Sequence, residues 1–480
     1  MPARLAALRN NRIIDSAPLS LQIRCGKSFC SWCRLGSRLR DQGGIGMTRG
    51  KLFLATIVAA FSVATAVPLA WAASVSRVSV ATGGKEADGE SYDPAISADG
   101  RYVAFVSTAT NLVIGDTNGV SDVFLRDRVA GTTTRVSVSN SGAQASGASG
   151  VSTSVKAVAI SATGRYVAFS SDAKDLVVGD TNGTTDVFVR DRVLKQTTRV
   201  SVTASGGQSS GTSGRWGIAI SADGRYVAFG ALATLVPGDT NAAHDVYLRD
   251  RTSRTTERVS VRTGGAQGTL ASMFPSISAD GRYIAFTSLA GNLVIGDTNN
   301  DDDVFVRDRV AKTTTRVSVA NSGAGGDRNS GRDGLAISAD GLIVGFASDA
   351  RNLVVGDSNL TTDVFVHGRT PAFTSRVSVS TGGNQADSFS YLPAVSGNGR
   401  FVAFASPASN LFPNFNGRTG IYVRDRSAGT TTRIIAGLGH SGQKGIAISS
   451  DGRAVAFQSY AGNLVTGDNN GVGDVFVYQQ

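Results

Sequence analysis

A ten-residue segment that occurs seven times is the feature that most limits how this chain can fold. Its first copy is Ile96-Ser-Ala-Asp-Gly-Arg-Tyr-Val-Ala-Phe105, and the equivalent glycines lie 53 to 64 residues apart. A second segment follows each copy and begins as Asp122-Val-Phe-Leu-Arg-Asp-Arg128 in the first repeat. Repeats of this period predict one structural unit per copy, each stacked against its neighbours. The repeated glycines are Gly100, Gly164, Gly224, Gly281, Gly341, Gly399 and Gly452.

Each repeat predicts four short strands and no helix. In the first repeat we expect strands at about 93–98, 101–107, 122–127 and 134–139, with a tight turn at Asp99-Gly100. The second strand has apolar side chains on both of its faces, which fits a sheet covered on both sides by neighbouring blades. The phenylalanines near the end of this strand are therefore predicted to fill the core between blades. They are Phe105, Phe169, Phe229, Phe286, Phe346, Phe404 and Phe457.

The two ends of the repeat region complement each other. The last copy ends at Tyr478-Gln479-Gln480 without a fourth strand, whereas Ser74-Val-Ser-Arg-Val-Ser-Val80 has the fourth-strand pattern and no repeat before it. We expect this N-terminal strand to complete the last blade and close the ring, so that no sheet edge stays open there. The predicted fold is an all-β, seven-bladed β-propeller of four-stranded antiparallel blades, spanning residues 73–480.

The repeat resembles that of the TolB-type, WD-repeat-like β-propeller family of bacterial exported proteins. The resemblance rests on Ser97-Ala-Asp-Gly-Arg-Tyr-Val-Ala-Phe105 and Asp122-Val-Phe-Leu-Arg-Asp127, and it covers nearly all of residues 74–480. It implies the propeller fold. The α/β domain that precedes the propeller in TolB has no counterpart in this sequence, so the resemblance implies fold rather than a role in the Tol system.

The first 72 residues predict export. A basic start at Met47, an uncharged segment from Leu52 to Leu69 and the small-residue pattern ending at Ala72 have the order of a signal peptide. A membrane anchor is the alternative for this segment. We assign residues 47–72 to a signal peptide and residues 1–46 to an upstream extension outside the native protein. The expected product is periplasmic or extracellular and has no stable membrane anchor.

Charge and cysteine content change once those residues are set aside. Cys25, Cys30 and Cys33 all lie within residues 1–46, where their spacing suggests a metal site but lacks a fourth ligand. The remaining chain has 37 basic and 35 acidic residues, a net charge of about +2, and no cysteine. This balance gives no electrostatic case for a nucleic-acid partner. Without disulfides, stability must come from packing.

The long loops of the predicted propeller gather on one face. In an antiparallel four-stranded blade, the connection between the second and third strands and the connection to the next blade lie at the same end. In the first repeat these are residues 108–121 and 140–156. Loops held on a rigid scaffold are the usual place for function. We therefore expect a protein, peptide or glycan ligand on this long-loop face, at the mouth of the central channel, and a monomeric protein.

The loop between the second and third strands carries the most specific chemical pattern, Gly-Asp-Thr-Asn-x-x-x-Asp. Its two carboxylates and amide oxygen are ligands of the kind that Ca²⁺ takes, although the pattern lacks the length and terminal Glu of an EF-hand. The alternative is that Asp and Asn cap a tight turn. In the sixth repeat Asn414 and Gly420 replace the two carboxylates, while Asn416 remains. The candidate calcium ligands are Asp116, Asn118, Asp122, Asp180, Asn182, Asp186, Asp239, Asn241, Asp245, Asp297, Asn299, Asp303, Asp357, Asn359, Asp363, Asp468, Asn470 and Asp474.

Arg-Asp-Arg follows the third predicted strand in five repeats, beginning with Arg126. An anion-binding stripe is one interpretation. Regular placement with Asp between the two arginines favours salt bridges between blades instead, and exposed pairs of this kind add little stability each.

Catalytic patterns are weak in this sequence. The three histidines, His244, His367 and His440, occupy different places in their repeats. A Gly-x-Ser-x-Gly match at 207–211 lies in a Gly/Ser-rich loop and not at a strand-to-helix turn. We therefore expect a non-enzymatic binding or scaffolding module. The alternative is a hydrolase or lyase at the channel mouth, with carboxylates such as Asp301 and Asp302 as acid and base.

Overall fold

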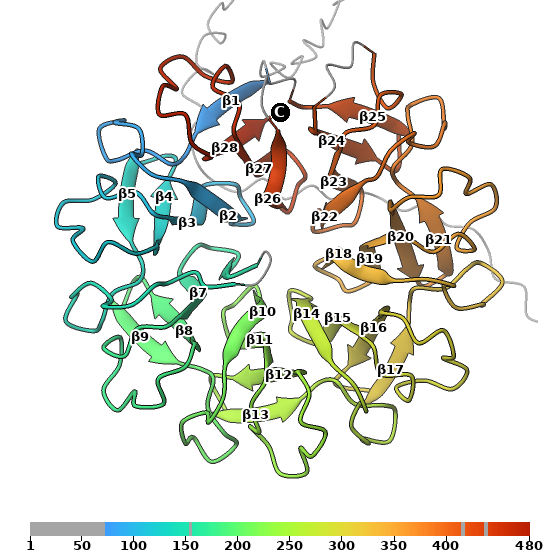
Figure 1. Ribbon diagram of the computed structural model, residues 1–480, viewed down its shortest axis with the longest axis horizontal. Helices are drawn as coiled ribbons and strands as arrows, with labels where there is room; N and C mark the ends of the chain where they lie inside the picture. The colour runs from blue at the N-terminus through green and yellow to red at the C-terminus, as the bar shows by residue number, and fades with distance from the viewer. Residues whose placement is uncertain (1–72, 153–155, 414–417, 436–439) are drawn as a thin grey trace, which may run out of the picture. The chain divides into compact units, whose positions relative to one another are not determined.

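Each repeat folds as a separate four-stranded antiparallel sheet. A computed structural model describes residues 73–152, 156–413, 418–435 and 440–480, so residues 1–72, to which the sequence analysis assigns a signal peptide and an upstream extension, lie outside the described residues. The described residues form seven such sheets and contain no helix. Figure 1 shows the sheets arranged about a central axis as the blades of a β-propeller, which confirms the predicted fold class.

From the axis outwards, the first blade contains β2 (Ser91–Ile96), β3 (Tyr102–Ser107), β4 (Asp122–Asp127) and β5 (Thr132–Arg135). Blades two and three contain β6 (Val158–Ile160), β7 (Tyr166–Ser171), β8 (Asp186–Asp191), β9 (Gln196–Arg199), β10 (Ser213–Ile220), β11 (Tyr226–Ala231), β12 (Asp245–Asp250) and β13 (Thr255–Arg258). Blades four and five contain β14 (Ser272–Ile277), β15 (Tyr283–Ser288), β16 (Asp303–Asp308), β17 (Thr313–Arg316), β18 (Ser330–Ile337), β19 (Ile343–Ser348), β20 (Asp363–Arg369) and β21 (Ala372–Arg376). Blades six and seven contain β22 (Tyr391–Val395), β23 (Phe401–Ser406), β24 (Gly420–Asp425), β25 (Thr430–Arg433), β26 (Ser441–Ile448), β27 (Ala454–Ser459), β28 (Asp474–Gln479) and β1 (Ser74–Arg77).

The N-terminal strand closes the ring as predicted. β1 pairs antiparallel with β28, from Ser74 opposite Gln479 to Arg77 opposite Phe476, and becomes the outermost strand of the seventh blade. The pairing continues beyond the strand, because the backbone N–H of Val78 donates to the carbonyl of Val475 at 2.7 Å. The last blade therefore takes strands from both ends of the repeat region.

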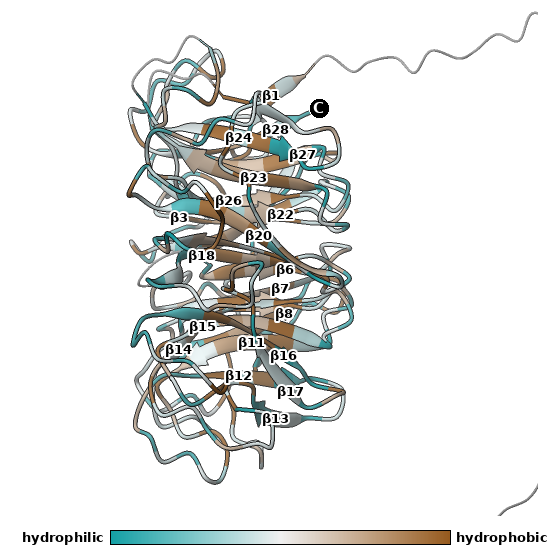
Figure 2. Cartoon of the chain, turned by 90° about the vertical axis from the view of Figure 1, so that its right-hand side faces the viewer, coloured by the Kyte–Doolittle hydropathy of each residue, from teal (hydrophilic) through white to brown (hydrophobic). Residues whose placement is uncertain are grey.

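The hydrophobic core lies between the blades. Seven clusters of buried residues fill the seven boundaries, and each takes side chains from two neighbouring blades. Phe105 and its six equivalents are all fully buried, which confirms their predicted role. Figure 2 shows the strands edge on, stacked above one another, with many of the hydrophobic residues in them. Apolar faces buried on both sides hold the ring together without disulfides.

A closed ring of backbone hydrogen bonds encircles the axis at the turns between the first and second strands. In each blade, the N–H of the residue two positions before the turn glycine donates to the carbonyl of the equivalent residue in the next blade, at 2.8 to 3.0 Å. The last bond, from Ser450 to Ala98, returns to the first blade. These bonds hold the short-turn end of the axis together. The ring runs through Ala98, Ala162, Ala222, Ala279, Ala339, Gly397 and Ser450.

The Arg-Asp-Arg run acts differently from the prediction. Its Asp forms an ion pair within its own blade, as Asp127 does with Arg101 at 2.7 Å, so the expectation of salt bridges between blades is wrong for this residue. The same carboxylate accepts the backbone N–H groups of Val129 and Ala130, which caps the turn to β5. In three of the five runs, the arginine that follows lies over a tyrosine ring of the preceding blade; these arginines are Arg192, Arg251 and Arg309. Arg309, which also forms an ion pair with Glu257 of the preceding blade, is the one charged link of the predicted kind in these runs.

The fourth strand of each blade is shorter than predicted. β5 spans Thr132–Arg135 and not 134–139, because the chain leaves the sheet after Arg135. The hydroxyl of Ser137 then donates to the carboxylate of Asp122, and Val138 forms an isolated bridge with Gln144. These contacts fold the connection back over the loop that carries the Asp/Asn pattern.

Candidate functional site at the axial rim

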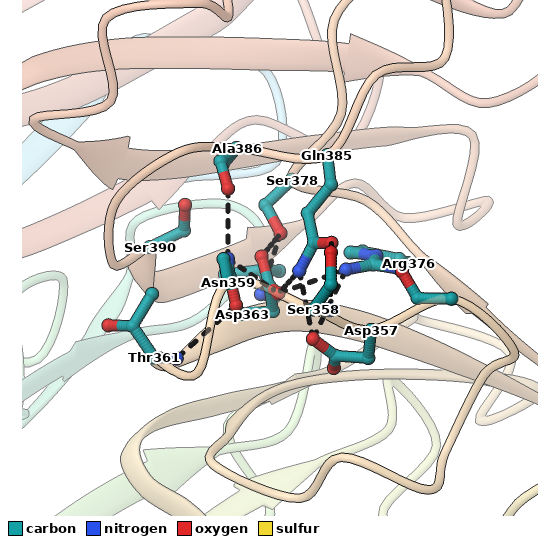
Figure 3. Close-up of polar contacts among 12 residues, drawn as sticks. Asp357, Ser358, Asn359, Thr361, Asp363, Arg376, Ser378, Gln385, Ala386 and Ser390 are labelled. Atoms are coloured by element: carbon teal, nitrogen blue, oxygen red, sulfur yellow. Dashed lines mark hydrogen bonds and ion pairs between the residues drawn. The ribbon is translucent and has the colours of Figure 1, made fainter.

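The Asp/Asn pattern of each loop forms a compact cluster around an arginine. In the fifth blade, Arg376 Nη1 lies 3.4 Å from Asp357 Oδ1 and 3.2 Å from Asp363 Oδ2 (Figure 3). Gln385 Nε2 donates to the same two carboxylates at 2.8 and 3.0 Å. The arginine comes from β21 and the glutamine from the connection that follows it. The chain itself therefore supplies a positive charge between the two carboxylates.

The carboxylate at the start of the third strand has its oxygens fully engaged. Asp363 Oδ1 accepts from Ser378 Oγ at 2.5 Å, and Oδ2 accepts from Asn359, Gln385 and Arg376. The Asn359 amide presents its nitrogen to Asp363, while its oxygen accepts the N–H of Thr361. Burial raises the pKa of Asp363, and the hydrogen bond from Ser378 and the charge of Arg376 oppose that rise.

All six complete copies of the pattern share an arginine between the two carboxylates. In each, one arginine of the fourth strand lies between 3.1 and 3.7 Å from both carboxylates. In each copy the arginine places a positive charge beside both carboxylates, although Asp245 Oδ2 of the third blade accepts no hydrogen bond among the described residues. Within the described ranges, no group of three or more His, Cys, Asp or Glu side chains is placed to hold a metal ion. The geometry favours the capped-turn alternative, in which these loops support the fold. The arginines are Arg77, Arg135, Arg199, Arg258, Arg316 and Arg376.

The sixth blade has lost the cluster as a unit. Gly420 and Ile435 stand where the fifth blade has Asp363 and Ser378, and Arg433 Nε donates to the carbonyl of Ile435 at 2.9 Å. Asn414 and Asn416 lie outside the described residues. In the fifth blade the Ser378 hydroxyl donates to Asp363 and accepts the backbone N–H of Val364. Loss of the carboxylate removes the acceptor for that hydroxyl, so the sixth blade has lost both members of the hydrogen bond.

A second feature of the fold is that the innermost strands occur in two forms. In the first, fourth and sixth blades the segment is Ser-x-x-Pro, beginning at Ser91, Ser272 and Ser390. In the third, fifth and seventh blades it is Ser-Gly-x-x-Gly, which is two residues longer before the strand resumes. Register shifts mark this position in both forms, as between Ser213 and Ile218 of β10. Bulges of this kind redirect side chains and occur often near functional sites.

The two forms alternate because neighbouring blades approach closely at the axis. A Cβ on Gly217 would lie 3.2 Å from Cα of Phe274, and a Cβ on Gly334 would lie 2.9 Å from Cα of Leu392. The second glycine of each Ser-Gly-x-x-Gly segment thus makes room for the Ser-x-x-Pro segment of the next blade. Gly445 does so for the first blade. Seven blades cannot alternate completely. The second blade is left unpaired, and its inner segment matches neither form.

The second blade sends a lysine across the axial region. Lys156 Nζ donates to the carbonyl of Leu335, although the second and fifth blades are not neighbours. The backbone N–H of Lys156 donates at 2.8 Å to Asp93 of the first blade. Burial lowers the pKa of Lys156 to about 8, although the charge of Asp93 acts to raise it. Burial also raises the pKa of Asp93 to about 6, although hydrogen bonds from the backbone of Lys156 and Ala157 act to lower it.

Four of the ten described non-glycine residues with positive φ lie at the same level of the axis. Asp93, Lys156, Phe274 and Leu392 have positive φ angles of 51°, 71°, 55° and 52°, and the three long-form blades have glycine at the equivalent position. Residues with side chains adopt this conformation only where the surrounding structure enforces it. Strain of this kind is most common at binding and catalytic sites.

The side chains around the long-loop end of the axis differ from blade to blade, and we call them the axial rim. Three positions contribute: the start of the first strand, the residue after the second strand and the residue before the third strand. Antiparallel pairing places all three at one end of the blade. The axial rim consists of Tyr92, Arg215, Trp216, Met273, Arg332, Asp333, Tyr391 and Lys444 at the first position, Thr108, Asp172, Leu232, Leu289, Asp349, Pro407 and Tyr460 at the second, and Ser121, Thr185, His244, Asp302, Thr362, Thr419 and Gly473 at the third.

Arginines of the rim reach back to the preceding blade. Arg215 Nε donates to Thr185 Oγ1 at 2.7 Å, and its Nη2 lies 3.3 Å from Asp172 Oδ2. Arg332 Nε lies 2.8 Å from Asp302 Oδ2, with the arginine side chain 57% exposed and the aspartate fully buried. Burial raises the pKa of Asp302, and the charge of Arg332 opposes that rise. The arginines are therefore oriented by one carboxylate each while part of each guanidinium faces solvent.

A third charged group joins the seventh and first blades. Lys444 Nζ lies 2.8 Å from Glu90 Oε1 and 4.8 Å from the centroid of the Tyr92 ring. The Tyr460 hydroxyl also donates to Glu90. Burial, together with this hydrogen bond, raises the pKa of Tyr460 to about 12. Burial raises the pKa of Glu90, but the hydrogen bonds from Lys444 and Tyr460 outweigh it and leave the pKa below its usual value.

Aromatic groups complete the rim. The Trp216 and His244 rings lie with centroids 3.7 Å apart in the third blade, and burial lowers the pKa of His244. Trp216 and Tyr92 are both half-buried. The sequence interpretation missed these residues because they stand out only when the seven inner segments are aligned on their serines and compared. Of the alternative's candidate residues, Asp302 lies in the rim and Asp301 precedes it.

These features define a seven-bladed β-propeller with regular structural loops and an irregular axial rim. Among solved structures, an oligogalacturonate lyase from Vibrio parahaemolyticus matches with a TM-score of 0.50 and 10% identity, over 85% of this chain and 96% of that one. An oligogalacturonate lyase in complex with manganese matches with a TM-score of 0.51 and 11% identity, over 84% and 92% of the two chains. TolB from Acinetobacter baumannii matches with a TM-score of 0.36 and 14% identity, over 80% and 81%. Likeness at this level of identity shows the fold alone.

Comparisons of sequence add no family. No protein-family model matches the chain, and no curated protein matches it. In the part of the chain that the structure describes, there is no helix that could span a membrane.

Proposed function

We propose that this protein is an exported binding module and that its axial rim receives a protein, peptide or glycan ligand. One observation carries the proposal: Ser91 and its six equivalents are all serine, whereas the rim positions beside them differ from blade to blade. Side chains that the fold requires recur because every blade needs them. Side chains that differ in each blade, at one end of the axis, are available to match an asymmetric ligand.

The chemistry of the rim suits recognition. It combines guanidinium and ammonium groups, carboxylates and aromatic rings, and tryptophan, tyrosine and arginine are the residues that most often dominate binding energy at interfaces. Arg332 is 57% exposed and Lys444 44% exposed, so both have surface left for a ligand. Their carboxylate partners orient them in advance, which lowers the entropic cost of binding.

A library screen tests the proposal. The protein beginning at Ala73 is screened against immobilised peptides and glycans, and hits are measured in solution by calorimetry. We expect a ligand whose binding is lost when Trp216 is replaced by alanine. Ligands that bind equally well to the Trp216→Ala variant would place the binding surface elsewhere.

The enzymatic alternative has its own test. Two solved propellers of this fold are oligogalacturonate lyases, so release of unsaturated product from polygalacturonate is the assay to run. We expect none, because the Asp302 carboxylate is buried and paired with Arg332. Product formation that disappears in an Asp302→Asn variant would establish the lyase instead.

Calcium stabilisation is tested by thermal melting. We expect the melting temperature to be unchanged by calcium or EDTA, because an arginine already balances the two carboxylates of each complete loop. A ligand that binds only the folded state raises the melting temperature by mass action. A rise with calcium concentration that is reduced in an Asp122→Asn variant would establish the calcium prediction.

Export is tested by mass spectrometry of the protein from its native source. We expect a mature N-terminus at Ala73, no peptides from residues 1–46, and a monomer in size-exclusion chromatography. Peptides from the Cys25–Cys33 region in that material would contradict the assigned start.

A further inference from the structure

An arginine closes six of the seven blade boundaries at the short-turn end. Its Nη1 donates to the glycine carbonyl of the Asp-Gly turn in its own blade, at 2.6 to 3.0 Å. At four of these boundaries its guanidinium lies over the first residue of the second strand of the preceding blade. That residue is tyrosine, and the guanidinium carbon lies 4.1 to 4.5 Å from the ring centroid. The arginines are Arg128, Arg192, Arg251, Arg309, Arg369 and Arg426.

The boundary between the sixth and seventh blades has no such arginine. Gln480 stands in its place, since its N–H donates to the carbonyl of Arg453 as that of Arg128 donates to Arg101. The aromatic ring is present: Phe401 holds the position of the tyrosines, with Arg400 4.8 Å from the ring centroid on one side. Among the described residues, no hydrogen bond is made to the carbonyl oxygen of Gly452, the acceptor equivalent to Gly100.

A cavity occupies the place of the missing guanidinium. It has a volume of about 90 Å³ and is lined by Phe401, Val423, Asp425, Thr432, Gly452 and Gln480, among others. That is several times the space that one water molecule needs, and it is enough for a planar guanidinium group. Val423 is half-buried, whereas its six equivalents are fully buried, so this boundary is filled less completely than the others.

The charge of the cavity suits a cation. Asp425 pairs with Arg400, with Nη2 to Oδ2 at 2.7 Å, and hydrogen bonding to Arg400 lowers the pKa of Asp425 to about 2. The carboxylate is therefore ionised near neutral pH. At the boundary between the second and third blades, the equivalent Asp191 lies close enough to Arg251 to stabilise its charge. An aromatic face and a turn carbonyl hold the guanidinium at four other boundaries, and at one of these the carboxylate of Asp191 also acts on it.

We propose that this cavity is a binding site for the arginine side chain of a partner protein or peptide. The partner's guanidinium stacks on Phe401 opposite Arg400 and donates to the carbonyl of Gly452. The chain shows the binding mode itself, because its own arginines occupy the six equivalent places and four of them stack on a tyrosine ring. The site lies at the opposite end of the blades from the axial rim, so it is independent of the function proposed above.

The test uses N-acetyl-arginine-N-methylamide as the probe, titrated into the protein by calorimetry or NMR, with the lysine analogue in parallel. We expect one site for the arginine probe and markedly weaker binding of the lysine probe. A Gln480→Arg variant should fill the cavity with its own side chain and abolish binding, while its matched control, Gln480→Ala, should retain it. Phe401→Ala should weaken binding about five- to thirtyfold, the range expected for loss of a cation–π contact.

A converse variant asks whether the site can be created elsewhere. Arg192→Gln should open an equivalent cavity against Tyr102 and raise the number of arginine-probe sites from one to two. Absence of arginine binding to the unmodified protein, equal binding of the lysine probe, or unchanged binding to Gln480→Arg would each overturn the proposal. If Arg192→Gln does not fold, the two Gln480 variants still decide it.

Discussion

The guanidinium of Arg192 lies 4.5 Å from the centroid of the Tyr102 ring, across the boundary between the first and second blades. Arg101 lies against the same ring at 4.8 Å, and Gly164 of the second blade packs on its edge. One ring therefore contacts two arginines and a tight turn. This arrangement explains why the repeat keeps Gly, Arg and Tyr together: the turn of one blade is shaped to receive the ring of the blade before it.

Gly164 is expected to be required for packing as well as for backbone conformation. It has φ 71°, and a Cβ there would lie 2.3 Å from Tyr102 Cδ2. Gly119 has a similar φ of 67° with no atom within 4 Å of its Cβ position, so it is the matched control. Gly119→Ala should cost about 1 kcal/mol of unfolding free energy from strain alone. Gly164→Ala should cost about 1–3 kcal/mol more through the collision. Equal losses in urea denaturation would show that the ring does not constrain the turn.

The arginines of the Asp/Asn loops are expected to stabilise the folded protein most where they lie between two buried carboxylates. Arg135→Gln should destabilise the protein by about 3 kcal/mol, because it leaves Asp116 and Asp122 buried without a counter-charge. Arg433→Gln in the sixth blade is the control, since Gly420 stands in place of the second carboxylate there. We expect a much smaller loss for that variant by thermal or chemical denaturation. Comparable losses for the two would mean that the arginines stabilise the blades without regard to the carboxylates.

Lys156 is expected to make stability rise with pH in the alkaline range. Burial lowers its pKa to about 8 from an ordinary value of 10.5. Between these values the unfolded chain binds more protons than the folded one, so the free energy of unfolding increases as pH rises. A Lys156→Met variant should lack this increase, which amounts to about 3 kcal/mol at most, while exposed Lys85→Met should retain it. Parallel pH profiles for wild type and Lys156→Met would show that the lysine is not buried.

Ring closure is expected to control cooperativity. Deleting residues 73–82 removes β1, and it also removes Arg77 and Ser79, which contact Asp474 of β28. We expect the single unfolding transition to broaden or split, because the seventh blade would lose its outer strand. A synthetic peptide of residues 73–82, added in excess, should restore the sharp transition. An unchanged transition in the deleted protein would show that the ring does not need this strand to hold.

The blade count, the closure and the hydrophobic core could be predicted from the sequence because they repeat. Seven copies of one pattern show which positions the fold needs, and Phe105 with its equivalents lies where the alternation places it. Strand ends were harder to predict. The fourth strand stops at Arg135 because Ser137 and Gln144 turn back to Asp116 and Asp122, and such contacts leave no mark on local alternation.

The chemistry of the loops was harder still to predict. Asp116, Asn118 and Asp122 are close in sequence and suggested an ion, but their counter-charge, Arg135, comes from a strand that begins after the Arg-Asp-Arg run. The axial rim was missed for a different reason. Trp216 and Arg332 stand in Gly/Ser-rich segments that have no strand pattern. Their significance depends on the alternation of two inner-strand forms, and that alternation arises from contacts between blades.

The most direct test of the account is the affinity of the ligand found by screening, measured by calorimetry for three variants of equal melting temperature. Trp216→Ala and Lys444→Gln alter the axial rim, and Val193→Ala alters an exposed side chain in a turn at the opposite end of the blades. If the rim is the binding surface, the two rim variants should each bind about tenfold more weakly or worse, and Val193→Ala should bind as wild type does. Wild-type affinity in both rim variants, or a loss confined to Val193→Ala, would contradict the proposal that this propeller binds its ligand at the axial rim.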